Sequence, residues 1–378
     1  MRIAVNATSF INQTFENDKN SYSGFFLRLA ISQPKHTFIF IFDKPQQKGT
    51  PFPENVVPVM VGPEANTIIK LRIWYHIKIP AALKKHKADI FISENLVSLK
   101  TKIPQLLIAP DLTFLHQPSF INKKHLDFYK KYTPRFISKA DIVIVYSQFL
   151  KNEIIKRYKT DEKRIEVIYK ETNDHFNPLS YEEKEVIKEK YADGNEYFIY
   201  KGTISTQQNL MNLLKAFSVF KKRQKSKMHL IIVGNSGIGY KDFMESLRLF
   251  RFHNEVKVLE NIPINEMSKM IASAYSMIFV PLYETAFTQP LEAMECETPV
   301  IVSSTGALPE FCGDAALYCD PENYKDIAEK MMLIFKDEKG RKELIEKEKI
   351  QRKKFPSGGS LETTFQIIEN LARKTLSK

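Results

Sequence analysis

The chain has 378 residues, 43% of them hydrophobic and 26% charged, a composition typical of globular proteins at a length that favours two domains. No apolar run approaches the roughly 18 residues of a membrane span, so an integral membrane protein is not expected. The net charge of +12 is concentrated in residues 1–180, which hold 27 Lys and Arg against 16 Asp and Glu. Such a surface attracts nucleic acid, anionic lipid or phosphorylated substrates. No nucleic-acid-binding motif accompanies it, so we expect no nucleic acid partner, and general solubility stays as the alternative to an anionic lipid.

Strand-like apolar runs alternate with helical patterns from the start of the chain. The first series of runs covers residues 2–6, 37–42, 56–60, 89–92, 105–109, 142–146 and 165–169. Apolar residues with a 3.6-residue period over 123–138 and 147–158 predict helices between them. The alternation predicts parallel βαβ units. Because residues 1–6 already form the first expected strand, no room is left for an export signal, and we expect a cytoplasmic protein.

The polar segment 171–195 interrupts the series and predicts a linker into a second domain. A second series of apolar runs follows at 197–201, 228–233, 256–259, 276–280 and 298–302. We therefore predict an α/β fold with an N-terminal domain over 1–177 and a C-terminal domain over 178–357. The three cysteines have no metal-ligand spacing and are expected to be packing residues.

Residues 67–87 combine six Lys or Arg with apolar side chains. The apolar residues considered are Leu71, Ile73, Trp74, Ile77 and Ile79. A basic amphipathic segment of this kind could dock on anionic lipid. An ordinary helix of the first domain explains it equally simply, and we favour that interpretation.

Two glutamates, Glu284 and Glu292, follow the apolar run 276–280 at a spacing of eight residues. The first lies in the expected loop and the second in the opening turn of the expected helix. A strand that leads through a loop into a helix is where open α/β sheets bind anions. Ionised carboxylates accept hydrogen bonds from hydroxyl groups. A nucleotide sugar, with its diphosphate and its hydroxyl-rich sugars, suits both features.

Residues 283–321 resemble the signature of the retaining glycosyltransferases of family 4. The residues that match it are Glu284, Pro290, Leu291, Glu292, Ala293, Met294, Cys296, Thr298, Pro299 and Val300. Segments 111–120, 140–154 and 201–217 continue the likeness, so it spans nearly the whole chain.

The resemblance implies a GT-B architecture, in which two Rossmann-like domains face each other across a cleft. Helix 358–378 would pack back on the N-terminal, acceptor-side domain, and the C-terminal domain would bind a nucleoside-diphosphate sugar. Glu284 and Asp111 would be the catalytic residues, and Glu292 would hold the donor ribose. The donor-binding set would be Gly202, Thr203, Gln207, Gln208, Asn235, Ile262, Thr288, Gln289 and Glu292. No metal and no other cofactor is expected, and the chain contains no Asp-x-Asp motif of the other major glycosyltransferase fold.

Several positions depart from the family pattern. Gln207 and Gln208 stand where an Arg-Lys pair commonly grips the diphosphate, which predicts an affinity weaker by roughly ten-fold unless another cation replaces them. Lys201 is the nearest candidate, although it could equally point into the sheet. Residues 285–287 replace glycines and are expected to narrow the sugar pocket. Pro110 replaces a histidine before Asp111.

The matches and the departures together leave two functions from different classes. The first is an active transferase that moves a hexose-type sugar to a glycan or polyprenyl-diphosphate-linked acceptor, in surface polysaccharide assembly. The basic N-terminal domain would give such an enzyme a peripheral contact with the inner face of the membrane. The second is a GT-B-fold subunit or glycan-binding partner that has lost turnover; a GT-B epimerase or phosphorylase is a lesser third. Retained Glu284 and Glu292 favour the transferase, and the substitutions at Gln208 and Pro110 favour the second.

Overall fold

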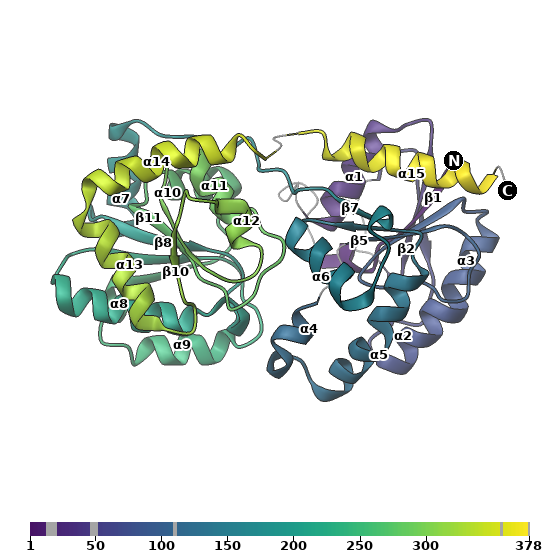
Figure 1. Cartoon of the computed structure of the whole chain (residues 1–378), viewed down its shortest axis with the longest axis horizontal. Helices are drawn as coiled ribbons and strands as arrows, with labels where there is room; N and C mark the ends of the chain where they lie inside the picture. Colours follow the sequence, from purple (N-terminus) through teal and green to yellow (C-terminus); the bar gives the residue numbers. More distant parts are fainter. Residues whose placement is uncertain (13–20, 46–51, 109–111, 356–357, 377–378) are drawn as a thin grey trace. The chain divides into compact units, whose positions relative to one another are not determined.

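The computed structural model describes residues 1–12, 21–45, 52–108, 112–355 and 358–376, which form two compact units (Figure 1). The N-terminal unit is Met1–Lys170 with Gly358–Lys378, and the C-terminal unit is Glu171–Ser357. The first part of the N-terminal unit thus ends at Lys170, before residue 177, where the sequence analysis placed the boundary. The reason is that the segment after Lys170 already bonds to the second unit: Arg352 donates to Thr172 Oγ1 at 2.6 Å.

The described part of the N-terminal unit contains a parallel seven-stranded sheet in the order β3-β2-β1-β4-β5-β6-β7. Its strands are β1 (Arg2–Asn6), β2 (Thr37–Phe42), β3 (Val56–Met60), β4 (Ile90–Glu94), β5 (Gln105–Ile108), β6 (Ile142–Val145) and β7 (Ile165–Val167). Successive side chains point to opposite faces: Ile3 and Val5 enter one core and Ala4 the other. Both faces are covered, as continuous apolar strands predict.

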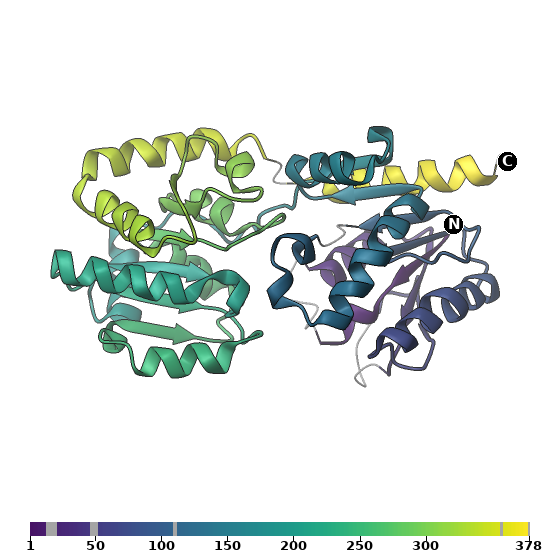
Figure 2. The same cartoon turned by 60° about the horizontal axis from the view of Figure 1, so that its bottom comes forward.

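Helices cover the two faces of this sheet. The helices are α1 (Tyr22–Ser32), α2 (Ile68–Ile73), α3 (Ile79–Lys85), α4 (Thr113–His116), α5 (Lys123–Lys139), α6 (Gln148–Tyr158) and α15 (Ser360–Leu376). One face carries α1 and α15, which lie in the same unit although they are far apart in sequence (Figure 1 and Figure 2). The other face carries α2, α3, α5 and α6. A π-helical turn, Trp74–Lys78, joins α2 to α3 and buries both Trp74 and Tyr75.

The described part of the C-terminal unit contains a parallel six-stranded sheet in the order β10-β9-β8-β11-β12-β13. Its strands are β8 (Tyr197–Lys201), β9 (His229–Val233), β10 (Val256–Leu259), β11 (Ser276–Phe279), β12 (Val300–Ser303) and β13 (Leu317–Cys319). The sequence analysis did not predict β13, a three-residue edge strand. From β8 the chain adds β9 and then β10 on one side of β8, and it then returns to place β11 on the other side of β8. The loops after β8 and β11 therefore meet at a topological switch point, where open α/β sheets bind ligands.

The helices of this unit are α7 (Tyr181–Ala192), α8 (Leu210–Gln224), α9 (Tyr240–Arg248), α10 (Ile264–Ala272), α11 (Gln289–Glu295), α12 (Leu308–Cys312), α13 (Tyr324–Lys336) and α14 (Glu338–Arg352). Contacts pair α13 with α8 on one face, and α10 with α7 and α11 with α14 on the other (Figure 1). Ser180 and Glu183 form a reciprocal capping box that fixes the start of α7. All three cysteines, Cys296, Cys312 and Cys319, are buried.

Candidate functional site

The loop after β8 brings Gly202, Thr203 and Asn235 together. Gly202 has φ +153°, and a Cβ at Gly234 would lie only 1.6 Å from the Gly202 carbonyl oxygen, so the loops after β8 and β9 meet at two glycines. Gly202 N–H donates to Val233 at 3.0 Å, and Ile204 N–H donates to the Asn235 carbonyl at 2.9 Å. The backbone at the carboxyl end of β8 is thus fixed, with Thr203 and Asn235 exposed beside it.

Asn209 connects this loop to the rest of the sheet. It lies in the left-handed region with φ +61° and precedes the first residue of α8. Its buried amide donates to the carbonyl oxygens of Val280 at 3.0 Å and Pro321 at 2.7 Å. Gln207 contributes its own carbonyl, which accepts from Leu282 N–H at 3.3 Å. The Gln207–Gln208 turn is therefore tied to the loop that follows β11.

Gln208 contacts Glu284 directly. Its Nε2 donates to Glu284 Oε2 at 3.4 Å, and its Oε1 lies 3.3 Å from the hydroxyl of Tyr200. Burial raises the pKa of Tyr200 well above its usual value, with Glu284 as the second cause, so this phenol stays neutral. The sequence analysis missed Tyr200. As the fourth residue of β8 it is indistinguishable by pattern from a core side chain.

The backbone of Glu284 is held by the loop after β12. Its carbonyl accepts from Ala307 N–H at 3.0 Å, and one of its carboxylate oxygens accepts from Thr285 N–H at 3.1 Å. Gly306, at φ +65°, makes this approach possible, since a Cβ there would lie 2.2 Å from the Glu284 carbonyl oxygen. Because the chain has only 13 glycines, Gly306 was the feature of the sequence that could have predicted this contact.

Glu292 lies in the first turn of α11 and its side chain is only 3% exposed. Thr288 Oγ1 donates to its Oε1 at 2.8 Å. The ammonium of Lys201 forms an ion pair with its Oε2, and the same ammonium lies 4.9 Å from the centre of the Phe176 ring. Lys201 therefore does not point into the sheet: it is the cation that lies against the second glutamate.

The expectation that residues 285–287 narrow a sugar pocket is wrong for Phe287. That ring is 3% exposed and packs at 4.6 Å from the Phe311 ring and 5.8 Å from the Phe279 ring. It fills the interior of the C-terminal unit. An aromatic side chain in an α/β loop gains more by joining a core than by lining a polar surface.

The other predicted site residues are less closely associated with Glu284 and Glu292. Gln289 folds back so that its Oε1 accepts from Thr288 N–H at 3.1 Å. Ile262, half-buried, follows β10, which is separated from β8 by β9, so the sheet order places it away from the glutamates. Pro110 and Asp111 lie outside the described residues.

Comparison with protein families identifies two regions of the chain. The model for group 1 glycosyl transferases matches residues 182–351, and the model for glycosyltransferase family 4 matches residues 32–170. Among curated relatives, O-antigen chain mannosyltransferase B of Escherichia coli is 24% identical over 275 residues, which are 72% of this chain and 72% of that protein.

Solved structures show the same fold at low identity. Sucrose-phosphate synthase of Thermosynechococcus elongatus aligns with a TM-score of 0.79 at 16% identity, over 98% of this chain and 99% of that one. Anabaena HepE, solved in complex with UDP and glucose, aligns with a TM-score of 0.70 at 15% identity, over 99% and 100% of the two chains. Matches to both family models, with two parallel-sheet units of this topology, lead to one conclusion: the chain belongs to the group 1, family 4 glycosyltransferases and has the GT-B fold.

Proposed function

We propose that this glycosyltransferase takes a hexose from a nucleoside-diphosphate sugar, with retention of anomeric configuration, and adds it to a glycan or polyprenyl-diphosphate-linked acceptor in surface polysaccharide assembly. The observation that carries the proposal is a pair of side-chain contacts at the switch point, which join the end of β8 and its loop to the segment after β11. Gln208 and Lys201, from the end of β8 and its loop, contact Glu284 and Glu292, which follow β11. Similarity to an O-antigen mannosyltransferase and to a fold solved with UDP bound supports the acceptor and donor classes.

In this proposal Glu292 accepts hydrogen bonds from the donor ribose. In this buried carboxylate, Thr288 Oγ1 donates to Oε1, and Lys201 contacts Oε2. When ribose hydroxyls engage Glu292, the Lys201 ammonium becomes free to face the adjacent diphosphate. Lys201 thereby replaces the cations absent at Gln207 and Gln208. A charge-assisted hydrogen bond of this kind contributes about 1.5 to 3 kcal/mol.

Glu284 then acts on the transferred sugar. Gln208, oriented by Tyr200, and Thr285 N–H each donate to its carboxylate, so the side chain has a defined position before any donor arrives. Transfer without a metal would depend on positioning and on electrostatic stabilisation of the departing diphosphate. The diphosphate itself would accept the proton of the acceptor hydroxyl, so that this mechanism needs no separate base.

The acceptor proposal includes a peripheral contact with anionic lipid. No helix in the described part of the chain is both long and apolar enough to cross a membrane. In the helical segment 68–85, Ile69, Ile73 and Ile77 are 71%, 38% and 60% exposed, with Arg72 and Lys78 exposed beside them. Exposed isoleucines next to cations suit a bilayer surface that is apolar below and anionic above. Trp74 and Ile79 are instead buried in the core, as the ordinary-helix interpretation expects for those two residues.

A thermal-shift panel of UDP-, GDP-, ADP- and dTDP-sugars tests the proposed donor class, because ligand binding stabilises the folded state by RT ln(1 + [L]/Kd). We expect one base to raise the melting temperature and a Glu292→Ala variant to lose that response. A protein whose melting temperature responds to none of these nucleotides would contradict the proposal.

A further inference from the structure

The loop between β11 and α11, residues 280–288, lies alongside segment 303–311, which runs from the end of β12 into α12. Their contacts follow the order of the sequence, because each later residue of the loop contacts a later residue of the segment. The hydrogen bonds run from Ser303 Oγ to the Pro281 carbonyl at 2.8 Å, from Thr305 Oγ1 to the Leu282 carbonyl at 3.2 Å and from Ala307 N–H to the Glu284 carbonyl at 3.0 Å. The segment thus holds the loop as far as Glu284.

The next contact in this order joins two aromatic rings. Phe311 of α12 packs against Phe287 with ring centres 4.6 Å apart, and the two residues are 1% and 3% exposed. Phe311 in turn stacks on Phe355, with ring centres 5.0 Å and ring planes 5° apart. Helices α11 and α12 are neighbours in this unit (Figure 1). Because buried aromatic pairs are stabilised beyond the area they bury, Phe311 offers the loop a well-held partner.

Phe287 attaches the loop at a point between the two glutamates. Its ring also packs on Phe279, the last residue of β11, at 5.8 Å between ring centres. Glu284 precedes it by three residues, and Thr288, whose hydroxyl donates to Glu292 at 2.8 Å, follows it directly. The ring therefore fixes the stretch of backbone that presents both carboxylates.

This attachment depends on a departure from the family pattern. Glycine in residues 285–287 would give the loop no side chain to bury and would leave its backbone more conformational freedom. Here the contacts of Phe287 with Phe279 and Phe311 restrict the loop before a ligand arrives. A loop that is already ordered loses less entropy when a ligand binds, and it keeps its polar groups in one geometry.

We propose that Phe287 and Phe311 are positioning residues of the transferase, which hold the loop so that the carboxylate of Glu284 meets the transferred sugar. Both rings are buried, so they act through the loop and not on the ligand. The inference rests on the proposed function for the role of Glu284, whereas the restraint on the loop does not depend on it.

Hydrogen exchange of the ligand-free protein tests the restraint. We expect Phe287→Ala to speed exchange in peptides that cover residues 282–288 by about ten-fold or more, because the loop loses its buried anchor. Phe220→Ala is the matched control. Phe220 is an equally buried ring of the same unit, and it lies on α8 in contact with Phe198 and Phe335. Its loss should leave the exchange of the loop at the wild-type rate at a temperature where both variants are folded.

Calorimetric titration tests the positioning, with UDP against UDP-glucose and GDP against GDP-mannose. The pair whose nucleotide binds the wild type more tightly is used for the variants. Phe287→Ala should raise the dissociation constant of the nucleotide sugar relative to that of the nucleotide by about five-fold or more, because a misplaced Glu284 loses a charge-assisted contact with the sugar. A general loss of packing would weaken both ligands alike. In a Glu284→Gln background the change should not alter the ratio further, since both substitutions remove the same interaction.

Phe311→Leu replaces Phe287→Ala if the latter does not fold, with the same direction expected in both measurements. The positioning role is overturned if loop exchange is the same in the variant and in Phe220→Ala, if the ratio of dissociation constants stays at the wild-type value, or if the effect persists in the Glu284→Gln background. A wild type that binds neither nucleotide rejects the donor proposal and the positioning role together. A wild type that binds one of them, with an unchanged ratio in the variant, rejects the positioning role alone.

Discussion

Lys201 and Glu292 form an ion pair between the last residue of β8 and the first turn of α11. Their side chains are 18% and 3% exposed, so solvent screens the pair only weakly. Loss of one partner from such a buried pair leaves an uncompensated charge. The pair is therefore a structural contact, and we propose that its Lys201 also supplies positive charge to the donor diphosphate.

Substitution of Lys201 by Met tests that second role. Lys201→Met should weaken nucleoside-diphosphate binding by about ten-fold or more, because a charge-assisted contact is lost. The dissociation constant is measured by calorimetry at a temperature where both proteins are folded. Lys215→Met, an exposed change on α8 of equal charge, should leave it unchanged. Equal affinities of Lys201→Met and wild type would show that Lys201 serves only to neutralise Glu292.

The sequence predicted part of this arrangement. Glu284 lies in the loop after β11 and Glu292 in the first turn of α11, as their spacing indicated, because that placement depends only on a strand, a loop and a helix. The direction of Lys201 could not be predicted, because the last residue of a strand can point to either face or to the edge. The role of Phe287 was wrong because a loop sequence does not show which side chains turn toward the core.

At the scale of elements, the segment 68–85 separates its residues into a buried and an exposed face. If the exposed isoleucines contact lipid, the wild type should co-sediment with vesicles containing phosphatidylglycerol, and less so at high salt because the basic residues contribute. The triple change Ile69→Ser, Ile73→Ser and Ile77→Ser should abolish most of the binding. Leu249→Ser, which alters a side chain 89% exposed in the other unit, should not. Undiminished sedimentation of the triple variant would exclude this face as the contact.

Helix α14 carries a buried glutamate that contacts the first residue of β12. Glu348 is 0% exposed, its Oε1 accepts from Val300 N–H at 3.0 Å, and α14 packs against α11. Burial raises the pKa of this carboxyl well above its usual value, opposed in part by the Val300 bond and Arg341. In the unfolded chain the same group ionises above about pH 4.3. Its contribution to stability is thus complete below that pH and is lost as the pH rises through the folded-state pKa.

Glu348→Gln should remove that dependence, because an amide stays neutral. We expect the variant to gain stability relative to wild type at pH 8 compared with pH 5, by about 1.4 kcal/mol for each pH unit in that interval over which the carboxyl stays protonated in the folded protein and is ionised in the unfolded chain. Urea denaturation at the two pH values measures the difference. Glu346→Gln on the same helix, with a side chain 70% exposed, is the control of equal charge and should follow the wild type. Parallel pH profiles for Glu348→Gln and wild type would refute the assignment.

Elements with long apolar runs were predictable and short ones were not. The runs 37–42 and 197–201 coincide with β2 and β8, because strands buried on both faces are nearly continuous in apolar residues. Strand β13 has three residues at the edge of its sheet, with two of them only half-buried, and gives no such signal. The π-helical turn at Trp74 was also not predicted, since such turns are rare and the pattern of apolar residues does not distinguish them from an α-helix.

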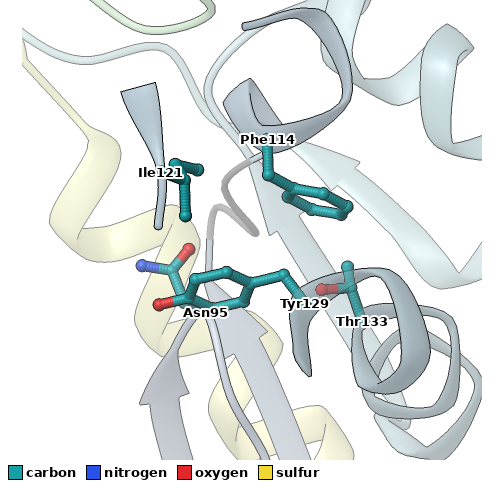
Figure 3. Close-up of a pocket in the computed structure, with 5 residues that line it drawn as sticks. All are labelled: Asn95, Phe114, Ile121, Tyr129 and Thr133. Carbon is teal, nitrogen blue, oxygen red and sulfur yellow. The ribbon is translucent and has the colours of Figure 1, made fainter. Parts of the chain in front are cut away.

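At the scale of the whole molecule, the two units divide the expected chemistry. The C-terminal unit holds the glutamates, and the N-terminal unit holds the exposed isoleucines and a pocket of about 210 Å³ lined by Asp43 and Glu94. A second pocket of about 40 Å³ shares Asn95 and Tyr129 with it, and Figure 3 shows the hydroxyl end of Tyr129 directed toward Asn95. The uneven net charge left an anionic lipid and general solubility as alternative explanations for the basic N-terminal half. The pocket lined by Asp43 and Glu94 has no Lys or Arg among its described lining residues, because net charge describes the surface as a whole and not the sign within one cavity.

The central claim, that Glu292 holds a donor ribose, is tested most directly by calorimetric titration with a ribonucleoside diphosphate and its 2′,3′-dideoxy analogue. Both ligands carry the same base and diphosphate, so they differ only in the ribose hydroxyls and in what those hydroxyls change at Glu292 and Lys201. The account predicts that the wild type prefers the ribonucleotide by at least about ten-fold, as expected for hydrogen bonds to a charged acceptor. Glu292→Ala should lose the preference, and Glu284→Gln should keep it. Equal affinity of the wild type for the two nucleotides, or a preference that survives in Glu292→Ala, would contradict the account.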